Sequence, residues 1–313
     1  MRRLSLLSLF AAVALLAACN GRDTSPGADR NETPGDAQPS TAASAPPSAS
    51  PSASASPATV FPPAVQSLLD QAKAAGRNRY LYAIDQGATV VPTSDGRSFA
   101  IVWQPDTAGD GVPFIATIHG HAGWAFNEFF LWHQYARERG YGIVALQWWF
   151  GQGERFQDYY SPREVNRELS IILGGAGAEP GKVLFHGFSR GSANSYAVVA
   201  YDRAAGQRYY GLAIANAGKP GLDFPGNVDI ESGAMGSQPL SGSKWVTFCG
   251  GKDEHPERDG CPGMREAATW IERYGGVVLK AIEDPEADHG GFHHNAVHIN
   301  AALDVFAGQL KGQ

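Results

Sequence analysis

The stretch Gly187-Phe188-Ser189-Arg190-Gly191 follows directly on the apolar run 182–186 and directly precedes the helix-like segment 192–200. A strand that ends in G-x-S-x-G and turns at once into a helix is typical of a nucleophile elbow, which presents one serine hydroxyl on a tight, strained turn. Glycine at both ends lets backbones approach closely around that turn. The pattern predicts that Ser189 is a nucleophile for acyl transfer. The pentapeptide by itself also suits a glycine-rich strand–helix turn with an incidental serine.

A serine nucleophile needs a base to take its proton and an acid to orient that base. Asp253 lies just past the buried run 244–249, and His289 lies in a glycine-flanked loop after the run 276–282. Ser189, Asp253 and His289 therefore occur in the chain order serine, acid, histidine. Each follows a predicted strand, and open parallel sheets place their sites at the carboxyl ends of strands. We predict that these three residues form a catalytic triad.

Both partners have competitors. Glu254, beside Asp253, is an alternative acid. Three further histidines compete with His289 for the role of base: His293, His294 and His298. Their helical spacing would also allow a metal site, but the sequence has no H-E-x-x-H motif and no nearby cysteine pattern. We therefore expect no metal and no organic cofactor.

A tetrahedral oxyanion is stabilised by backbone N–H groups aimed at the developing negative charge. One donor is expected to be the amide of Arg190, the residue after the nucleophile, and the other an amide in the loop after the third strand. The run 113–118 leads into His119-Gly120-His121, so the amide of His121 is the predicted second donor. The same pattern also suits an ordinary glycine-rich β–α turn.

Strand-like and helix-like segments alternate along most of the chain. We expect strands at 80–84, 98–103, 113–118, 142–147, 182–187, 210–215, 244–249 and 276–282. We expect helices at 126–138, 163–174, 191–203, 263–274 and 294–309. Such alternation predicts one α/β domain at residues 60–313, with a mostly parallel eight-stranded sheet and helices on both faces.

These motifs together resemble the α/β-hydrolase superfamily, and within it single-domain bacterial esterases of the feruloyl-esterase or polyhydroxyalkanoate-depolymerase type. The resemblance rests on His119-Gly120-His121, the stretch 187–191, Asp253 and His289, and extends over about residues 80–310. It implies the α/β-hydrolase fold and a serine carboxylic-ester hydrolase. The chain shows no substrate signature of one subfamily, so the acyl or aryl preference, a small or a polymeric ester, and the oligomeric state stay open.

Two other functions remain compatible with these residues. The same triad serves serine peptidases and acyltransferases, because the same groups open amides. An inactive hydrolase fold could act as a surface binding module, although such a protein has no reason to keep all three triad residues. The long polar, glycine-rich segment 219–243 is expected to wall the substrate pocket together with the aromatic-rich segment 147–160. Trp124, Trp148 and Trp149 are candidate lining residues.

The N-terminus has the pattern of an export signal: Arg2 and Arg3, an apolar run to Leu16, then Ala17-Ala18-Cys19. This ending resembles the lipobox of bacterial lipoproteins, which implies a signal peptide at residues 1–18, lipidation of Cys19 and an N-terminal membrane anchor. Asn20 is compatible with delivery to the outer membrane within the cell envelope. An ordinary cleaved signal is the alternative.

Residues 19–59 consist mainly of small and polar residues with proline, which cannot bury enough apolar surface to fold. We expect a flexible tether with an end-to-end distance of about 35 Å. Loss of Arg2 and Arg3 with the signal changes the formal charge from −6 to −8, which argues against nucleic acid as a partner. With Cys19 lipidated, Cys249 and Cys261 are expected to form a disulfide in an exported protein. Two free thiols are the alternative.

Overall fold

The computed structural model describes residues 60–106 and 111–312. The signal peptide, the lipidation site Cys19 and the tether predicted within residues 1–59 lie outside these ranges and stay predictions. Within the described ranges, no helix has the length and apolar character needed to cross a membrane.

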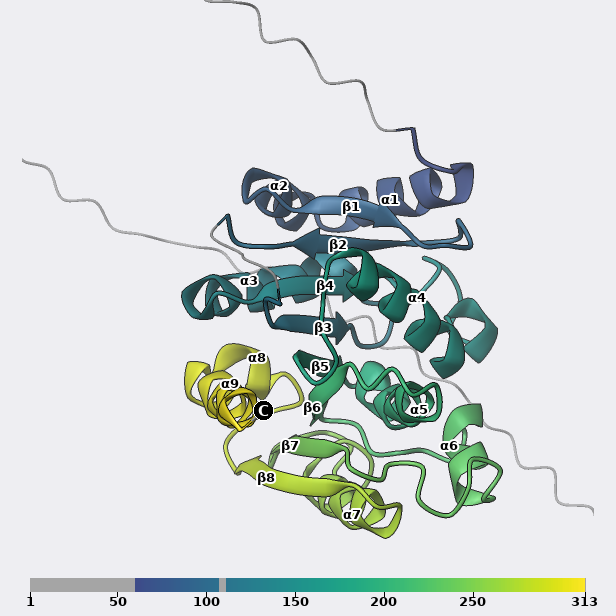
Figure 1. The fold of residues 1–313 in the computed structure, drawn as a ribbon, viewed down its shortest axis with the longest axis vertical. Coiled ribbons are helices and arrows are strands. Elements are labelled where there is room, and N and C mark those ends of the chain that lie inside the picture. The colour runs from purple at the N-terminus through teal and green to yellow at the C-terminus, as the bar shows by residue number, and fades with distance from the viewer. Residues whose placement is uncertain (1–59, 107–110, 313) are drawn as a thin grey trace, which may run out of the picture. The chain divides into compact units, whose positions relative to one another are not determined.

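An eight-stranded sheet organises the described residues, with the strand order β1-β2-β4-β3-β5-β6-β7-β8 (Figure 1). The strands are β1 (Thr89–Pro92), β2 (Phe99–Trp103), β3 (Phe114–Ile118), β4 (Gly142–Leu146), β5 (Val183–Phe188), β6 (Tyr210–Asn216), β7 (Lys244–Gly250) and β8 (Val277–Asp284). β1 and β2 pair antiparallel, as do β2 and β4, whereas every pairing from β4 to β8 is parallel. The predicted mostly parallel eight-stranded sheet is confirmed.

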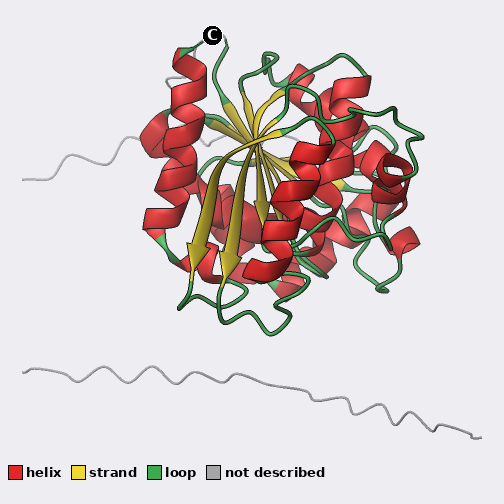
Figure 2. Ribbon diagram, turned by 90° about the horizontal axis from the view of Figure 1, so that it is seen from below, coloured by secondary structure: helices red, strands yellow, loops and turns green. Residues whose placement is uncertain are grey.

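Helices cover both faces of this twisted sheet (Figure 2). On one face lie α1 (Pro63–Ala75), α2 (Arg77–Asp85), α3 (Ala125–Arg139), α8 (Gly291–His294) and α9 (Ala296–Lys311). On the other lie α4 (Pro162–Gly175), α5 (Arg190–Ala204), α6 (Pro225–Glu231) and α7 (Cys261–Arg273). The central strands β3 and β4 are buried at every residue, which explains why they read as continuous apolar runs.

The first predicted strand, 80–84, is wrong. These residues lie in helix α2, and the first strand is β1. Tyr82 packs its ring 5.0 Å from that of Phe130 on α3, and its hydroxyl lies 2.8 Å from Nδ1 of His133. These contacts with α3 outweigh the strand-like aromatic pattern. The short β1 lies at the edge of the sheet, where Pro92, which lacks an N–H, is tolerated.

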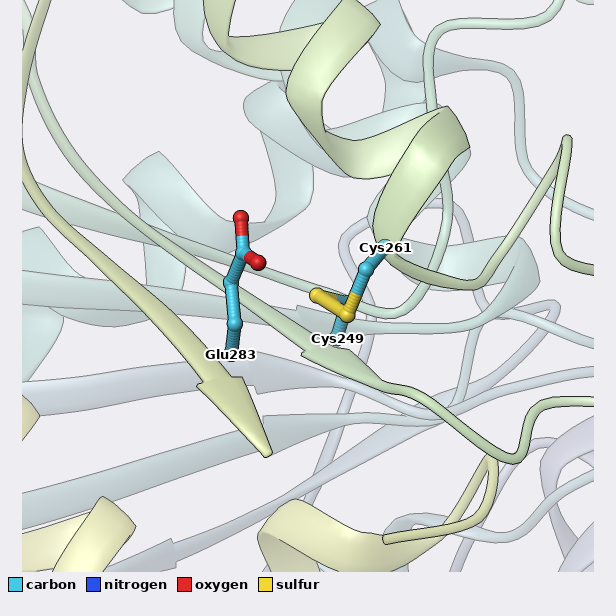
Figure 3. Close-up of side chains that lie close together, drawn as sticks. All are labelled: Cys249, Cys261 and Glu283. Carbon is cyan, nitrogen blue, oxygen red and sulfur yellow. A yellow bond between two sulfur atoms is a disulfide. The ribbon is translucent and has the colours of Figure 1, made fainter. Parts of the chain in front are cut away.

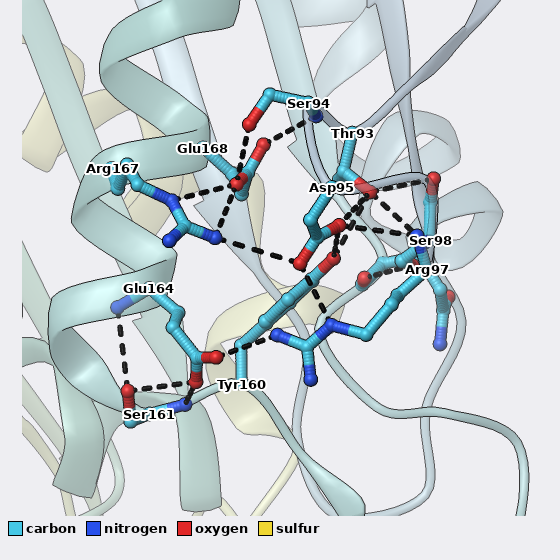
Figure 4. A network of polar contacts seen from close by, with 11 residues as sticks. Thr93, Ser94, Asp95, Arg97, Ser98, Tyr160, Ser161, Glu164, Arg167 and Glu168 are labelled. Carbon is cyan, nitrogen blue, oxygen red and sulfur yellow. Dashed lines mark hydrogen bonds and ion pairs between the residues drawn. The ribbon is translucent and has the colours of Figure 1, made fainter.

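A polar network ties the β1–β2 turn to the start of α4 (Figure 4). The buried carboxylate of Glu168 accepts hydrogen bonds from the backbone N–H of Ser94 at 2.6 Å and from its hydroxyl at 2.9 Å. The hydroxyl of Tyr160 donates to Oδ1 of Asp95 at 2.7 Å. This network anchors the end of the segment 147–160, which reaches the candidate site through Tyr159.

Candidate active site

Ser189 lies on a strained turn between β5 and α5. Its φ is +52°, a left-handed conformation that L-residues rarely adopt. A Cβ atom on Gly187 would lie 2.5 Å from the carbonyl oxygen of Gly191, and one on Gly191 would lie 2.7 Å from that of His119. Both glycines are therefore required by close backbone approach, as the motif indicates.

The structure brings the side chains of Ser189, His289 and Asp253 together, and these residues follow the carboxyl ends of β5, β8 and β7, respectively. His289 Nε2 lies 2.8 Å from Ser189 Oγ, and His289 Nδ1 lies 2.7 Å from Asp253 Oδ2. Asp253 is buried, and its Oδ1 accepts the backbone N–H of His255 at 2.8 Å. In the tautomer that carries its proton on Nδ1 and donates it to the carboxylate, Nε2 of His289 faces Ser189 Oγ and can accept the serine proton. The alternative acid Glu254 is exposed.

The loop 119–123, after β3, lies against the elbow. A Cβ on Gly120 would lie 3.2 Å from the Cβ of Ser189. The indole N–H of Trp148 donates to the carbonyl oxygen of His119 at 2.9 Å, and the Tyr159 hydroxyl accepts the N–H of Ala122 at 3.0 Å. These two bonds hold the loop in position beside Ser189.

The two predicted oxyanion donors belong to residues near the same serine: Arg190 follows Ser189 in the chain, and His121 lines the same cavities as Ser189. The backbone N–H of His121 has no hydrogen-bond partner among the described residues. Arg190 is the first residue of α5, where a backbone N–H has no acceptor within the helix. Burial lowers the pKa of the neighbouring His119 to about 4, so that imidazole is neutral at pH 7.

Two cavities reach both Ser189 and His121. The larger, of about 550 Å³, is walled by residues from the 119–123 loop, from α3 and from the segment that carries His289. The smaller, of about 210 Å³, is walled by Arg190 and Ala193 of α5 and by Lys219 and Phe224 of the segment 219–243. Part of the segment 219–243 therefore lies beside the serine, as expected.

The three candidate pocket tryptophans lie elsewhere. Trp148 is buried, supports the 119–123 loop and borders a third cavity of about 360 Å³, which also contacts Arg190. Trp124 and Trp149 pack against each other with ring centroids 5.2 Å apart, and neither borders the two cavities at Ser189. Aromatic residues that follow a strand serve here mainly as packing.

The Arg190 side chain was missed by sequence reasoning, which assigned a role only to its backbone amide. Its guanidinium lies over the rings of Tyr159 at 4.4 Å, Phe156 at 5.0 Å and Phe224 at 5.6 Å. Such cation–π contacts are attractive, and here they join the segments 147–160 and 219–243 to the start of α5. No local motif indicates this, because the three rings come from two separate loops.

Five largely buried polar side chains lie together at the wall of the larger cavity. We call them the Glu128 cluster, which comprises Glu128, Thr117, His186, Asn216 and His293. The Thr117 hydroxyl donates to Glu128 Oε2 at 2.8 Å, and His186 Nδ1 lies 3.4 Å from the same oxygen. Asn216 Nδ2 lies 3.2 Å from Nε2 of both His186 and His293. Burial alone would raise the pKa of Glu128, but His186 and the Thr117 hydroxyl lower it below its usual value. Burial lowers the pKa of His293 to about 4.

Sequence reasoning also missed Glu128. Its neighbours on α3, Phe129 and Trp132, are fully buried, and Glu128 lies one turn before Trp132 on the same helix face. An acidic residue on the buried face of an amphipathic helix was the available signal, since an unpaired buried charge is costly.

The three competing histidines do not converge on one point. His293 contacts Asn216, His298 Nε2 lies 2.8 Å from Asp284 Oδ2, and His294 borders the larger cavity. In the described ranges, two groups of three possible metal-ligating side chains occur, and neither contains these histidines. The groups are Cys249, Cys261 and Glu283, and Asp253, Asp259 and His289.

Cys249, in β7, and Cys261, at the start of α7, lie at disulfide-bonding distance, with 2.09 Å between their sulfur atoms and Glu283 nearby (Figure 3). They bracket the loop that carries Asp253. The cysteine pair predicted from the sequence is therefore bonded, and both thiols are unavailable to a metal.

Replacing both cysteines with alanine is expected to lower the free energy of unfolding by about 3 kcal/mol, because the unfolded chain loses a cross-link. That corresponds to a fall in melting temperature of about 6–12 °C for a domain of this size. Thermal unfolding followed by circular dichroism, with and without reductant, measures it. Reductant should leave the double variant unchanged. An unchanged melting temperature of the wild type, once mass spectrometry shows reduced cysteines, would contradict the prediction.

No protein-family model and no curated protein matches this chain. Solved structures do match it. An esterase from Pyrobaculum calidifontis has a TM-score of 0.52 at 14% identity, covering 78% of this chain and 92% of its own. A bacterial heroin esterase has a TM-score of 0.53 at 17% identity, with 80% and 94% covered. Thermogutta terrifontis esterase 2 has a TM-score of 0.52 at 17% identity, with 72% and 94% covered.

This chain has the α/β-hydrolase fold. The similar structures and the sheet order agree on that point, and the resemblance implied by the sequence motifs is confirmed at the level of the fold. At identities of 14–17% the likeness extends to the fold and not to the substrate.

Proposed function

We propose that this protein is a serine carboxylic-ester hydrolase that forms an acyl-enzyme on Ser189. One observation carries the proposal: His289 lies within hydrogen-bonding distance of both Ser189 Oγ, at 2.8 Å, and the buried carboxylate of Asp253, at 2.7 Å. This chemistry requires a nucleophile that is hydrogen-bonded to a base, which is in turn hydrogen-bonded to an orienting acid.

In the proposed reaction, Ser189 Oγ attacks the ester carbonyl carbon while its proton passes to His289 Nε2. The carbonyl oxygen becomes an oxyanion, which the backbone N–H groups of Arg190 and His121 stabilise. When the intermediate collapses, the bond to the alcohol oxygen breaks and His289 returns the proton to the departing alcohol. Water then attacks the acyl-serine by the same route and releases the acid. Asp253 keeps the imidazole oriented and stabilises its protonated form.

One observation favours ester cleavage over the peptidase, acyltransferase and binding alternatives: the solved structures that share the fold carry esterase names. The two cavities that meet at Ser189 offer separate space for the acyl group and for the leaving group. The proposed partner is therefore an ester of a small molecule or polymer.

We further propose that the protein is an exported lipoprotein of the bacterial cell envelope, at the outer membrane, anchored through Cys19. This proposal rests on the sequence of residues 1–20 alone. Mass spectrometry of the mature N-terminus tests it: a chain that begins with unmodified residues after Ala18 would contradict lipidation.

The full chain is expected to hydrolyse p-nitrophenyl esters and to react with a fluorophosphonate probe, because that probe labels an activated serine. A p-nitrophenyl series from acetate to palmitate is compared with peptide p-nitroanilides. The acyl chain length that is preferred gives the size of the acyl pocket. Absence of labelling in folded protein contradicts an active serine, and faster cleavage of anilides than of esters favours a peptidase.

A further inference from the structure

Of the two oxygens in the buried carboxylate of Glu128, one accepts a hydrogen bond from another side chain and the other does not. Oε2 accepts the Thr117 hydroxyl and lies near His186, whereas Oε1 has no hydrogen-bond partner within residues 60–106 and 111–312. The residue is only 3% exposed, yet it borders the larger cavity beside Ser189. Oε1 itself is not fully buried, so it is accessible from the cavity, where a hydrogen-bond donor of a ligand can reach it.

Glu128 acts there as an acceptor. Its pKa lies below the usual value for a glutamate, so the carboxylate is ionised and accepts hydrogen bonds only. A charge-assisted bond to such an oxygen is stronger than a bond between neutral groups. The ligand group in this cavity must therefore offer an O–H or N–H.

The other walls of the cavity favour a hydroxyl over a cationic group. Arg79 borders the same cavity, with its guanidinium 3.9 Å from the centre of the Phe130 ring, and its positive charge opposes an ammonium ligand. Asn127 adds an amide, which can both donate and accept. Phe188 supplies an apolar surface beside Ser189. Most of the remaining side chains on the wall are also polar, among them His119, His121 and His293, so the cavity offers several hydrogen-bonding groups to a hydroxylated small molecule.

We infer that the larger cavity binds the alcohol part of the ester and that this part is a sugar or polyol, with one hydroxyl donating to Glu128 Oε1. In an ester of a polyol, the remaining hydroxyls are all on the alcohol side, so the alcohol part is assigned to the cavity with Glu128. The smaller cavity, where Ala193 and Phe224 lie beside charged residues such as Lys219, is then left for the acyl group. The inference rests on the proposed function and names the substrate class of that site.

The test compares two esters of matched shape, glucose 6-butyrate and cyclohexylmethyl butyrate, with the full chain. The wild type should show a kcat/KM at least about tenfold higher for the sugar ester, since one charge-assisted hydrogen bond is worth a factor of that order. Glu128→Gln should lower this preference about tenfold. Glu138→Gln provides the matched control, because Glu138 is exposed on the same helix, and it should keep the wild-type preference.

Each outcome has one meaning. If the wild type shows no preference for the sugar ester, the inference is overturned. Because this measurement uses the wild type alone, it remains decisive even when Glu128→Gln does not fold. An equal loss of both activities in Glu128→Gln also overturns it, because Glu128 then has only a structural role. Butyrylcholine and its neutral analogue 3,3-dimethylbutyl butyrate are compared in the same way. If kcat/KM favours butyrylcholine by a larger factor than it favours the sugar ester, the polyol inference is overturned, because the cavity then binds a cationic alcohol. Failure of the esterase proposal is recognised separately, by the absence of fluorophosphonate labelling and of hydrolysis of every ester.

Discussion

Ser189→Ala is expected to reduce ester hydrolysis by about 10⁶-fold, the size of effect seen when a catalytic serine is removed from a triad enzyme. The reason is geometric: Ser189 Oγ is the atom that His289 Nε2 faces at 2.8 Å. Alanine removes that oxygen without creating a cavity in the core, because Ser189 borders the two open cavities. We therefore expect the melting temperature to stay within a few degrees of the wild type.

The rate with p-nitrophenyl butyrate and the thermal midpoint measure these two effects. Ser232→Ala is the matched control, since Ser232 is exposed and, within the described residues, its hydroxyl donates only to the nearby carbonyl oxygen of Asp229. Its activity should equal that of the wild type. Hydrolysis that persists in Ser189→Ala would rule out the acyl-enzyme on this residue.

Asp253→Asn is expected to reduce kcat by about 10⁴-fold near neutral pH. The amide can present an N–H to His289 Nδ1, which now lies 2.7 Å from a carboxylate oxygen. The imidazole would then hold its proton on Nε2 and could not accept one from Ser189. The fold should survive, because an amide oxygen can still accept the backbone N–H of His255.

Glu254→Gln provides the comparison for this prediction. Glu254 is adjacent and exposed, so its neutralisation should leave kcat close to that of the wild type. Kinetics of both variants, together with the rate of fluorophosphonate labelling, decide between the two acids. A larger loss in Glu254→Gln than in Asp253→Asn would assign the acid to Glu254.

The long apolar strands and the order of the candidate catalytic residues were predictable from the sequence. Parallel strands buried on both faces, such as β3 and β5, leave a largely apolar signal, in which Thr117 and His186 are the polar residues. The glycines of the elbow are required by local backbone contacts, so they also appear as a motif. The strand expected at 80–84 was wrong because α2 is held by contacts with α3, about 50 residues away in the chain.

The sequence by itself determined the fold class, the elbow at Ser189 and the short set of acids and histidines that could serve it. The sequence already favoured Asp253 over Glu254 and named His289 as the base, but only the tertiary structure gives the distances that place His289 between Asp253 and Ser189. The tertiary structure also revealed the open oxygen of Glu128 and the larger cavity. Local patterns report contacts between neighbours in the chain, whereas these features arise from side chains on different strands and helices that meet only when the sheet is assembled.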